Sequence, residues 1–153
     1  LIAVAEDLID DGVTTSDHLA VQGGSNGGLL TGVMYTQRPD LWGAVISQVP
    51  LLDMLRFHTL LAGASWQDEY GFPDENAEER AFLRSISPFH NVETGVDYPP
   101  MFLLTSTKDD RVHPGHARKL AYLLNEMDQD VYKEIKENKD FILNELEKEE
   151  ERS

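Results

Sequence analysis

Cysteine is absent from this chain of 153 residues, so a disulfide-stapled scaffold and thiolate metal sites are excluded. Basic residues are scarce: Lys and Arg number 13 against 28 Asp and Glu, which gives a formal net charge of −15. Nucleic acids and anionic lipid surfaces are bound by clustered basic side chains, so we expect neither as a partner. No apolar run approaches the roughly 18 residues that a membrane-spanning helix needs.

An initiator methionine and a basic N-terminal region are also missing, because the chain opens at Leu1. We therefore expect it to begin inside a larger protein, so an upstream signal peptide cannot be judged. The lack of cysteine is compatible with a reducing compartment, and we expect a cytoplasmic location. The residues that are present, 41% hydrophobic and 8% aromatic, are ordinary for one soluble domain with a core.

Apolar periodicity predicts strands that alternate with helices along the chain. Short buried strands are expected at 19–21, 42–49 and 101–105, and helices at 1–11, 29–37, 75–85 and after Pro114. Residues 53–62 are also interpreted as helical, and 63–73 as an aromatic-rich loop. This alternation favours an α/β fold with a mostly parallel sheet that helices cover on both faces.

The end of the chain differs in composition. Between Lys133 and Arg152, 13 of 20 residues are charged. Ile135, Ile142 and Leu146 form a narrow apolar stripe at helical spacing. We therefore predict a domain at 1–131 followed by a charged helical tail at 132–153, which is either a solvated helix or one that binds a partner.

The strongest local signal is the pattern Gly23-x-Ser25-x-Gly27 between an expected strand and an expected helix. Such a nucleophile elbow is a sharp, strained turn that lifts the Ser hydroxyl above the sheet, and small neighbours let strand and helix approach. The next backbone N–H, on Asn26, is then placed to hold an oxyanion. The pattern predicts Ser25 as a nucleophile, although a glycine-rich turn with an incidental Ser would look the same.

A Ser hydroxyl needs a base to remove its proton, usually a His that a carboxylate orients. In α/β-hydrolases the chain order is Ser, acid, His, with the acid after a later strand. Asp109 and Asp110 occupy that place behind the strand at 101–105. Without further information they could equally be turn or helix-capping carboxylates.

Two motifs resemble the prolyl oligopeptidase family of serine peptidases. Residues 23–28, Gly-Gly-Ser-Asn-Gly-Gly, are similar to its G-x-S-x-G-G elbow, and residues 109–119 are similar to its D-D-R-V-x-P-x-H-S-x-K acid loop. The resemblance covers about residues 1–131. It implies a partial α/β-hydrolase fold in which Asp109 is the triad acid and Arg111 contacts the substrate backbone.

The same resemblance assigns two aromatic residues. Trp66 and Tyr70, in the run Ser-Trp-x-x-Glu-Tyr-Gly, lie where the family carries aromatics near its pocket for proline, and the Trp there stacks on the proline ring. Read from the residues alone, Trp66 would be an ordinary half-buried aromatic. The implied substrate is a short peptide, cleaved after proline or a related residue.

The departures from the family concern the base. The family's catalytic His follows the acid in a Gly-His-Gly-type loop, and this sequence has no such loop. The histidines are His18, His58, His90, His113 and His116. Only the last two follow the acid, and they lie within the acid motif at the start of its helix. The earlier strands, the second oxyanion donor and the β-propeller are also missing. We therefore expect an incomplete catalytic domain with little or no peptidase activity alone.

Two other functions stay open. An esterase or lipase uses the same elbow, although the Asp-Asp-Arg-Val motif and Trp66 argue against it. A truncated, non-catalytic hydrolase could serve as an interaction module, and an exposed sheet edge or the C-terminal helix would then favour a homo-oligomer. We expect no cofactor and no metal, because Asp109 and Asp110 lack further ligands nearby and Arg111 adds an opposing charge.

Overall fold

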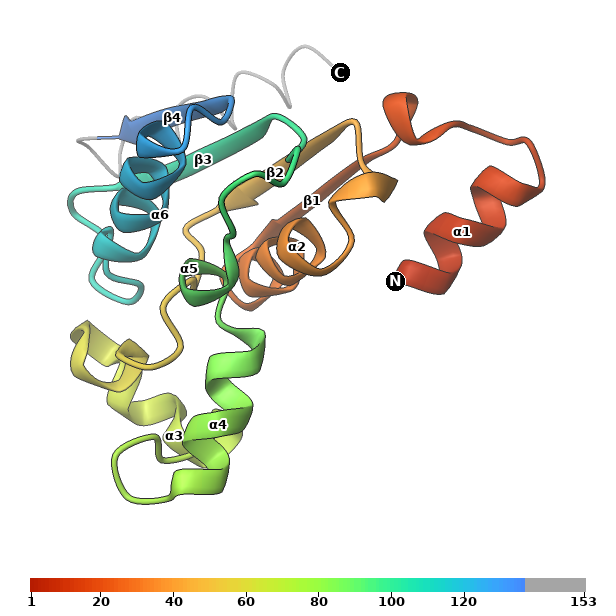
Figure 1. Cartoon of the computed structure of the whole chain (residues 1–153). Coiled ribbons are helices and arrows are strands. Elements are labelled where there is room, and N and C mark those ends of the chain that lie inside the picture. The colour runs from red at the N-terminus through yellow and green to blue at the C-terminus, as the bar shows by residue number, and fades with distance from the viewer. Residues whose placement is uncertain (137–153) are drawn as a thin grey trace, which may run out of the picture.

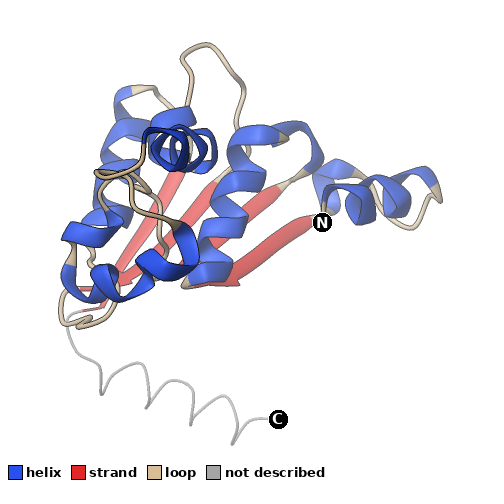
Figure 2. Cartoon of the chain, turned by 90° about the horizontal axis from the view of Figure 1, so that it is seen from below, coloured by secondary structure: helices blue, strands red, loops and turns tan. Residues whose placement is uncertain are grey.

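The computed structural model describes residues 1–136 and contains a parallel sheet with the strand order β1-β2-β3-β4 (Figure 1). The strands are β1 (Ala20–Gly24), β2 (Ala44–Gln48), β3 (Met101–Ser106) and β4 (Val131–Lys136). Helix α2 (Asn26–Gln37) connects β1 to β2, and helix α6 (Gly115–Glu126) connects β3 to β4. The predicted α/β fold with a mostly parallel sheet is confirmed, and Figure 2 shows the strands side by side.

The remaining elements are short. They are α1 (Ile2–Asp10), α3 (Gln67–Tyr70), α4 (Ala77–Ile86), α5 (Pro88–Asn91) and 3-10 turns at Ser16–His18, Pro39–Leu41, Phe57–Thr59 and Leu61–Trp66. Helix α1 ends before Gly12, which has the positive φ of 70° that favours glycine. Helix α4 begins after Asn76, whose side chain accepts the N–H groups of Glu78 and Glu79.

The predicted helix at 53–62 forms only in part, as short 3-10 helices at 57–59 and from 61 onward, because side chains from elsewhere bind the backbone at the start of this segment. The N–H groups of Leu52 and Asp53 both donate to Nδ1 of His116, and the N–H of Met54 donates to Oγ of Ser87. These tertiary hydrogen bonds hold residues 52–54 in an irregular conformation. The chain then forms two 3-10 turns, at 57–59 and at 61–66. Local apolar spacing carried no information about them.

One face of the sheet forms the main core. Val21, Val45 and Met101 are paired across β1, β2 and β3 and are buried against side chains of α2 and α6, as the helices in front of the strands in Figure 1 suggest. On the opposite face Gln22 is exposed and Phe102 is only partly buried. Within residues 1–136 the strand-flanking helices α2 and α6 therefore cover one face, whereas the sequence predicted cover on both.

The predicted helical tail at 132–153 is wrong for its first five residues. Residues 132–136, which we assigned to a helical tail, continue strand β4 beside β3. The rest of the predicted tail, 137–153, lies outside the described residues. None of the helices described in the chain is long and apolar enough to cross a membrane.

Candidate active site

Ser25 lies at the bend that joins β1 to α2, as the sequence predicted. Its backbone has φ 57° and ψ −114°, a strained combination for a residue other than glycine. Its N–H donates to the carbonyl of Gln48 on β2 at 2.9 Å, and its own carbonyl accepts the N–H of Leu29 at 3.1 Å. Strain of this kind costs about 1–3 kcal/mol and is held in place by the surrounding structure. The sheet on one side and the helix on the other provide that support.

Two of the motif's glycines allow the close approach of strand and helix. A Cβ at Gly23 would lie 2.3 Å from the carbonyl oxygen of Gly27, and a Cβ at Gly28 would lie 2.7 Å from Cβ of Pro50. At Gly27, in contrast, an added Cβ meets nothing within 4 Å. The tight packing that the motif implies is therefore present, but it depends on the absence of side chains at 23 and 28.

Asp109 lies in the loop after β3, at the same edge of the sheet as Ser25. Both residues follow the carboxyl ends of parallel strands, and β2 alone separates β1 from β3. Oδ1 of Asp109 accepts the N–H groups of Arg111 and Val112, each at 2.9 Å. These hydrogen bonds form a tight turn and also fix the direction of the carboxylate. The neighbouring Asp110 is exposed.

A second, smaller core brings the predicted site segments together. It contains Leu29 from the first turns of α2 and Val112 from the acid loop, both buried. Trp66 and Tyr70 pack against this cluster from the aromatic segment, each partly buried. Three segments that are far apart in sequence therefore converge around one apolar cluster. Arg111 is exposed beside it.

Tyr70 also touches the elbow directly. Its hydroxyl donates to Oδ1 of Asn26 at 2.6 Å, and Asn26 is the residue that follows Ser25. Burial raises the pKa of the Tyr70 hydroxyl, and the charge of Glu69 raises it further, so the phenol stays protonated at neutral pH. The sequence predicted Tyr70 near the pocket but contained no signal for this contact.

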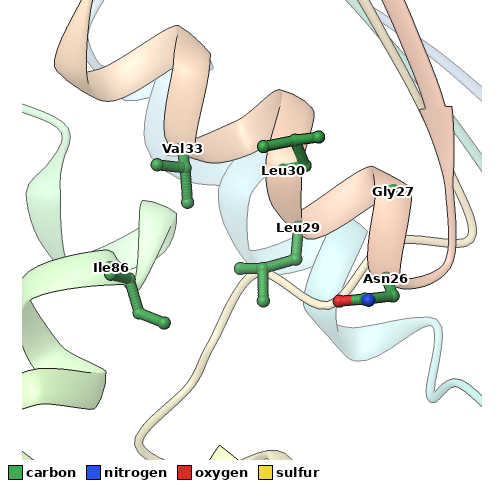
Figure 3. A pocket seen from close by; sticks show the side chains of 6 residues that line it. All are labelled: Asn26, Gly27, Leu29, Leu30, Val33 and Ile86. Atoms are coloured by element: carbon green, nitrogen blue, oxygen red, sulfur yellow. The ribbon is translucent and has the colours of Figure 1, made fainter. Parts of the chain in front are cut away.

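An apolar hollow of about 340 Å³ begins at the elbow and runs along the outer side of α2. Figure 3 shows Leu29 and Val33 of α2 and Ile86 of α4 pointing into it, with Asn26 at its rim. Sequence reasoning did not find this hollow, because Ile86, the last residue of α4, reaches it only through tertiary packing.

The five histidines all lie within the described residues, and their ring nitrogens form hydrogen bonds with residues other than Ser25 and Asp109. One nitrogen of each ring has such a hydrogen-bond partner. The partners are Thr15 for His18, Asp74 for His58, Ser87 for His90, the N–H of Gly115 for His113, and the N–H groups of Leu52 and Asp53 for His116. Within residues 1–136 the imidazole of a Ser–His–Asp triad is therefore not in place.

A second group of Ser, His and Asp side chains was missed by sequence reasoning, and its geometry is not that of a triad. Oγ of Ser87 lies 2.7 Å from Nδ1 of His90, and Oδ1 of Asp53 lies 3.8 Å from the same nitrogen. A triad needs its nucleophile and its acid on opposite ring nitrogens. Ser87 is also completely buried, so this group is structural. No group of three or more His, Asp or Glu side chains in residues 1–136 could hold a metal ion.

A buried polar network supports the acid loop from below. Asp53 is buried and forms an ion pair with Nζ of Lys119 on α6. One turn earlier, His116 is also buried, and its Nδ1 accepts the two N–H groups of Leu52 and Asp53. The network ties the start of α6, and with it the loop that carries Asp109, to the segment after β2. The acid motif in the sequence already contained His116 and Lys119, but not their partners.

The network predicts a loss of stability in mildly acidic solution. Burial lowers the pKa of His116 from 6.5 to about 4; the charge of Asp53 opposes this shift, and Lys119 and His113 add to it. Between pH 6.5 and pH 4 the imidazole of His116 is therefore protonated in the unfolded chain but remains neutral in the folded chain. Stability is complete above pH 6.5 and falls by about 1.4 kcal/mol per pH unit toward pH 4, about 3 kcal/mol in all.

Urea unfolding midpoints between pH 7 and pH 5 measure this slope, in a range where most carboxylates stay ionised. His116→Asn offers an oxygen as acceptor and has no titrating ring, so its stability should vary less with pH. A small slope should remain, because burial also lowers the pKa of His90. Equal slopes in the two proteins would contradict the assignment to His116.

Comparison with known proteins agrees with this geometry. A family model described as the prolyl oligopeptidase family matches residues 1–145. An uncharacterised peptidase of Sinorhizobium fredii is 64% identical over 125 residues, which cover 82% of this chain and 17% of that protein. A prolyl endopeptidase of Elizabethkingia miricola is 45% identical over 120 residues, or 78% of this chain and 17% of the relative.

Solved structures show the same likeness in three dimensions. A post-proline cleaving enzyme from Rickettsia typhi superposes with a TM-score of 0.86 at 39% identity, covering 89% of this chain and 20% of the enzyme. This chain thus spans a fifth or less of the length of these relatives. Since the family model matches nearly all of its residues and the elbow and acid loop meet at one sheet edge, the chain belongs to the prolyl oligopeptidase family.

Proposed function

We propose that this chain supplies the nucleophile, the acid and the proline pocket of a serine peptidase that cleaves short peptides after proline. The observation that carries the proposal is the convergence of the elbow, the aromatic segment and the acid loop on one apolar cluster. The names of the relatives, prolyl endopeptidase and post-proline cleaving enzyme, support the choice of substrate.

In the proposed mechanism each segment has one task. Oγ of Ser25 attacks the carbonyl carbon of the scissile bond, and the N–H of Asn26 donates to the oxygen that becomes negative. One such donor is typically worth a factor of about 10²–10³ in rate. The carboxylate of Asp109, held by two backbone N–H groups, orients a histidine that takes the Ser25 proton. Trp66 stacks on the proline ring, and Arg111 holds the substrate backbone.

We infer that the histidine comes from outside residues 1–136, because none of the hydrogen bonds formed by the five histidine rings in these residues reaches Ser25 or Asp109. Without a base the Ser25 hydroxyl stays protonated and reacts slowly, and loss of one triad member typically costs several powers of ten in rate. We therefore predict little or no amide hydrolysis by this chain alone.

Added imidazole tests the proposal, because it can replace a missing histidine as a diffusing base. An N-blocked glycyl-proline p-nitrophenyl ester should acylate Ser25 slowly in buffer and at least tenfold faster in molar imidazole, after subtraction of the reaction in free solution. A burst of p-nitrophenol, with mass spectrometry of the acylated chain, measures the rate. The Ser25→Ala variant should give no burst.

Matched esters decide the substrate class. An ester with leucine in place of proline should acylate at least tenfold more slowly if Trp66 stacks on the ring, and Trp66→Leu should remove that preference. Equal rates with a simple aryl ester would favour the esterase alternative. Stoichiometric labelling of Ser25 by a fluorophosphonate, as fast as in a complete family enzyme, would refute the predicted inactivity.

A non-catalytic interaction module is the second candidate. The observations that favour it are the other partners of the histidines and the outer edge of β1, which pairs with no other strand of residues 1–136. An unpaired edge presents backbone N–H and C=O groups to a second chain. Complete failure of imidazole to support acylation would favour this candidate.

A further inference from the structure

The hydroxyl of Tyr70 is already committed to another protein group. It donates to Oδ1 of Asn26 at 2.6 Å across 44 positions in the sequence. A phenol carries one proton for donation, so this hydroxyl cannot donate to a substrate at the same time. The contact therefore gives Tyr70 a task apart from lining a pocket with its ring.

Tyr70 is held in place both by its ring and by the backbone that follows it. It packs edge-on against the completely buried Phe57, with 5.4 Å between ring centroids and 76° between the planes. Directly after Tyr70 the chain turns at Gly71, where φ is 117°, and the next N–H, on Phe72, donates to Oε2 of Glu79 on α4 at 2.6 Å. The phenol is thus a fixed hydrogen-bond donor beside the elbow.

Asn26 lies at the first position of helix α2, on the surface of the molecule. Its side chain is exposed to solvent, and it directly follows the strained Ser25. No side chain caps this end of α2. The hydrogen bond from Tyr70 is the side-chain contact that joins Asn26 to the rest of the described structure.

We propose that Tyr70 is a positioning residue for the oxyanion-binding turn, because its hydroxyl fixes the Asn26 side chain and thereby the direction of the Asn26 backbone N–H. This inference rests on the proposed function, in which that N–H receives the developing negative charge. It also couples the aromatic segment to the elbow: a substrate that displaces Tyr70 would loosen the donor next to Ser25.

The first test is spectroscopic and needs no activity. In chain labelled with ¹⁵N-asparagine, Tyr70→Phe keeps the packing on Phe57 and removes only the hydroxyl. We expect both the backbone and the side-chain amide resonances of Asn26 to shift in this variant, while the other asparagines stay in place. Tyr122→Phe, at a tyrosine that is 67% exposed on α6, is the matched control and should leave Asn26 unmoved. Unmoved Asn26 resonances in Tyr70→Phe would overturn the proposal.

The second test separates positioning from substrate binding. In the imidazole-supported reaction with the prolyl ester, Tyr70→Phe should lower the limiting acylation rate about fivefold to tenfold and leave the half-saturating ester concentration nearly unchanged, since one neutral hydrogen bond is lost. Asn26→Ala keeps the backbone N–H and should give a similar loss. The double variant should be no slower than either single variant.

The outcomes are distinguishable. A higher half-saturating concentration with an unchanged limiting rate would assign the hydroxyl to substrate binding and end the positioning role. Additive losses in the double variant would show that Tyr70 and Asn26 act separately, which also overturns the inference. If the unsubstituted chain is not acylated even with imidazole, the proposed function fails, and the resonance test still decides whether Tyr70 positions Asn26.

Discussion

Gly23→Ala is expected to lower the free energy of unfolding by about 3 kcal/mol or more, whereas Gly27→Ala should change it by at most about 1 kcal/mol, in the stabilising direction. The two glycines belong to one motif but have different surroundings. A methyl group at 23 would stand 2.3 Å from the carbonyl oxygen of Gly27 and 2.6 Å from its carbon, and both are backbone atoms that cannot rotate away. A methyl group at 27 meets open space and favours the helix.

Urea unfolding followed by circular dichroism measures both changes, and imidazole-supported acylation of Ser25 reports whether the elbow survives. Gly28→Ala provides a second steric case, because its Cβ would lie 2.8 Å from the backbone Cα of Pro50. We expect it to resemble Gly23→Ala. Equal stabilities of Gly23→Ala and Gly27→Ala would show that strand and helix are not in close contact at the elbow.

Lys119→Met should lower the free energy of unfolding by about 2–3 kcal/mol, since it leaves the carboxylate of Asp53 buried without its cation. Asp53 is 1% exposed, and its other oxygen has no hydrogen-bond partner in the described residues. Nδ1 of His90 lies 3.8 Å from that oxygen, but burial lowers the pKa of His90, so this ring compensates little for the charge. Lys119 itself is one-third exposed, which places the expected loss below that of a completely buried pair. The contact of its ammonium with the ring of Phe89, 4.3 Å away, is lost as well.

The double variant Asp53→Asn with Lys119→Met tests the reason for this loss. It removes both charges and should be at least 1 kcal/mol more stable than Lys119→Met alone. Arg118→Met, at an exposed neighbour on the same helix, is the control and should cost little. If the double variant is no more stable than the single one, unpaired charge is not the cause, and lost packing of the lysine stem would explain the effect instead.

Local patterns sufficed for much of this molecule. The strand–elbow–helix unit around Ser25, the strand before Asp109 and the helix after Pro114 were all predicted, because each rests on short-range effects: apolar periodicity, glycine at a strained turn and proline before a helix. These features need only neighbours in sequence, so they can be read without coordinates.

Other features depended on contacts between distant segments. The segment at 53–62 did not form one continuous helix, because His116 of α6 and Ser87 before α5 bind the backbone N–H groups just before and within its start. The hydrogen bond between Tyr70 and Asn26 joins residues 44 positions apart, and the sequence around neither residue indicates it.

Ser25 and Asp109 were named from the linear order of residues, and the convergence of their segments on one edge is a property of the parallel sheet. Strand order, register and the second apolar cluster bring the elbow, the aromatic segment and the acid loop together. The chemistry of each side chain belongs to its residue type and immediate neighbours. Their distances from one another come from tertiary packing, because burial of apolar surface selects one arrangement among the many that local preferences allow.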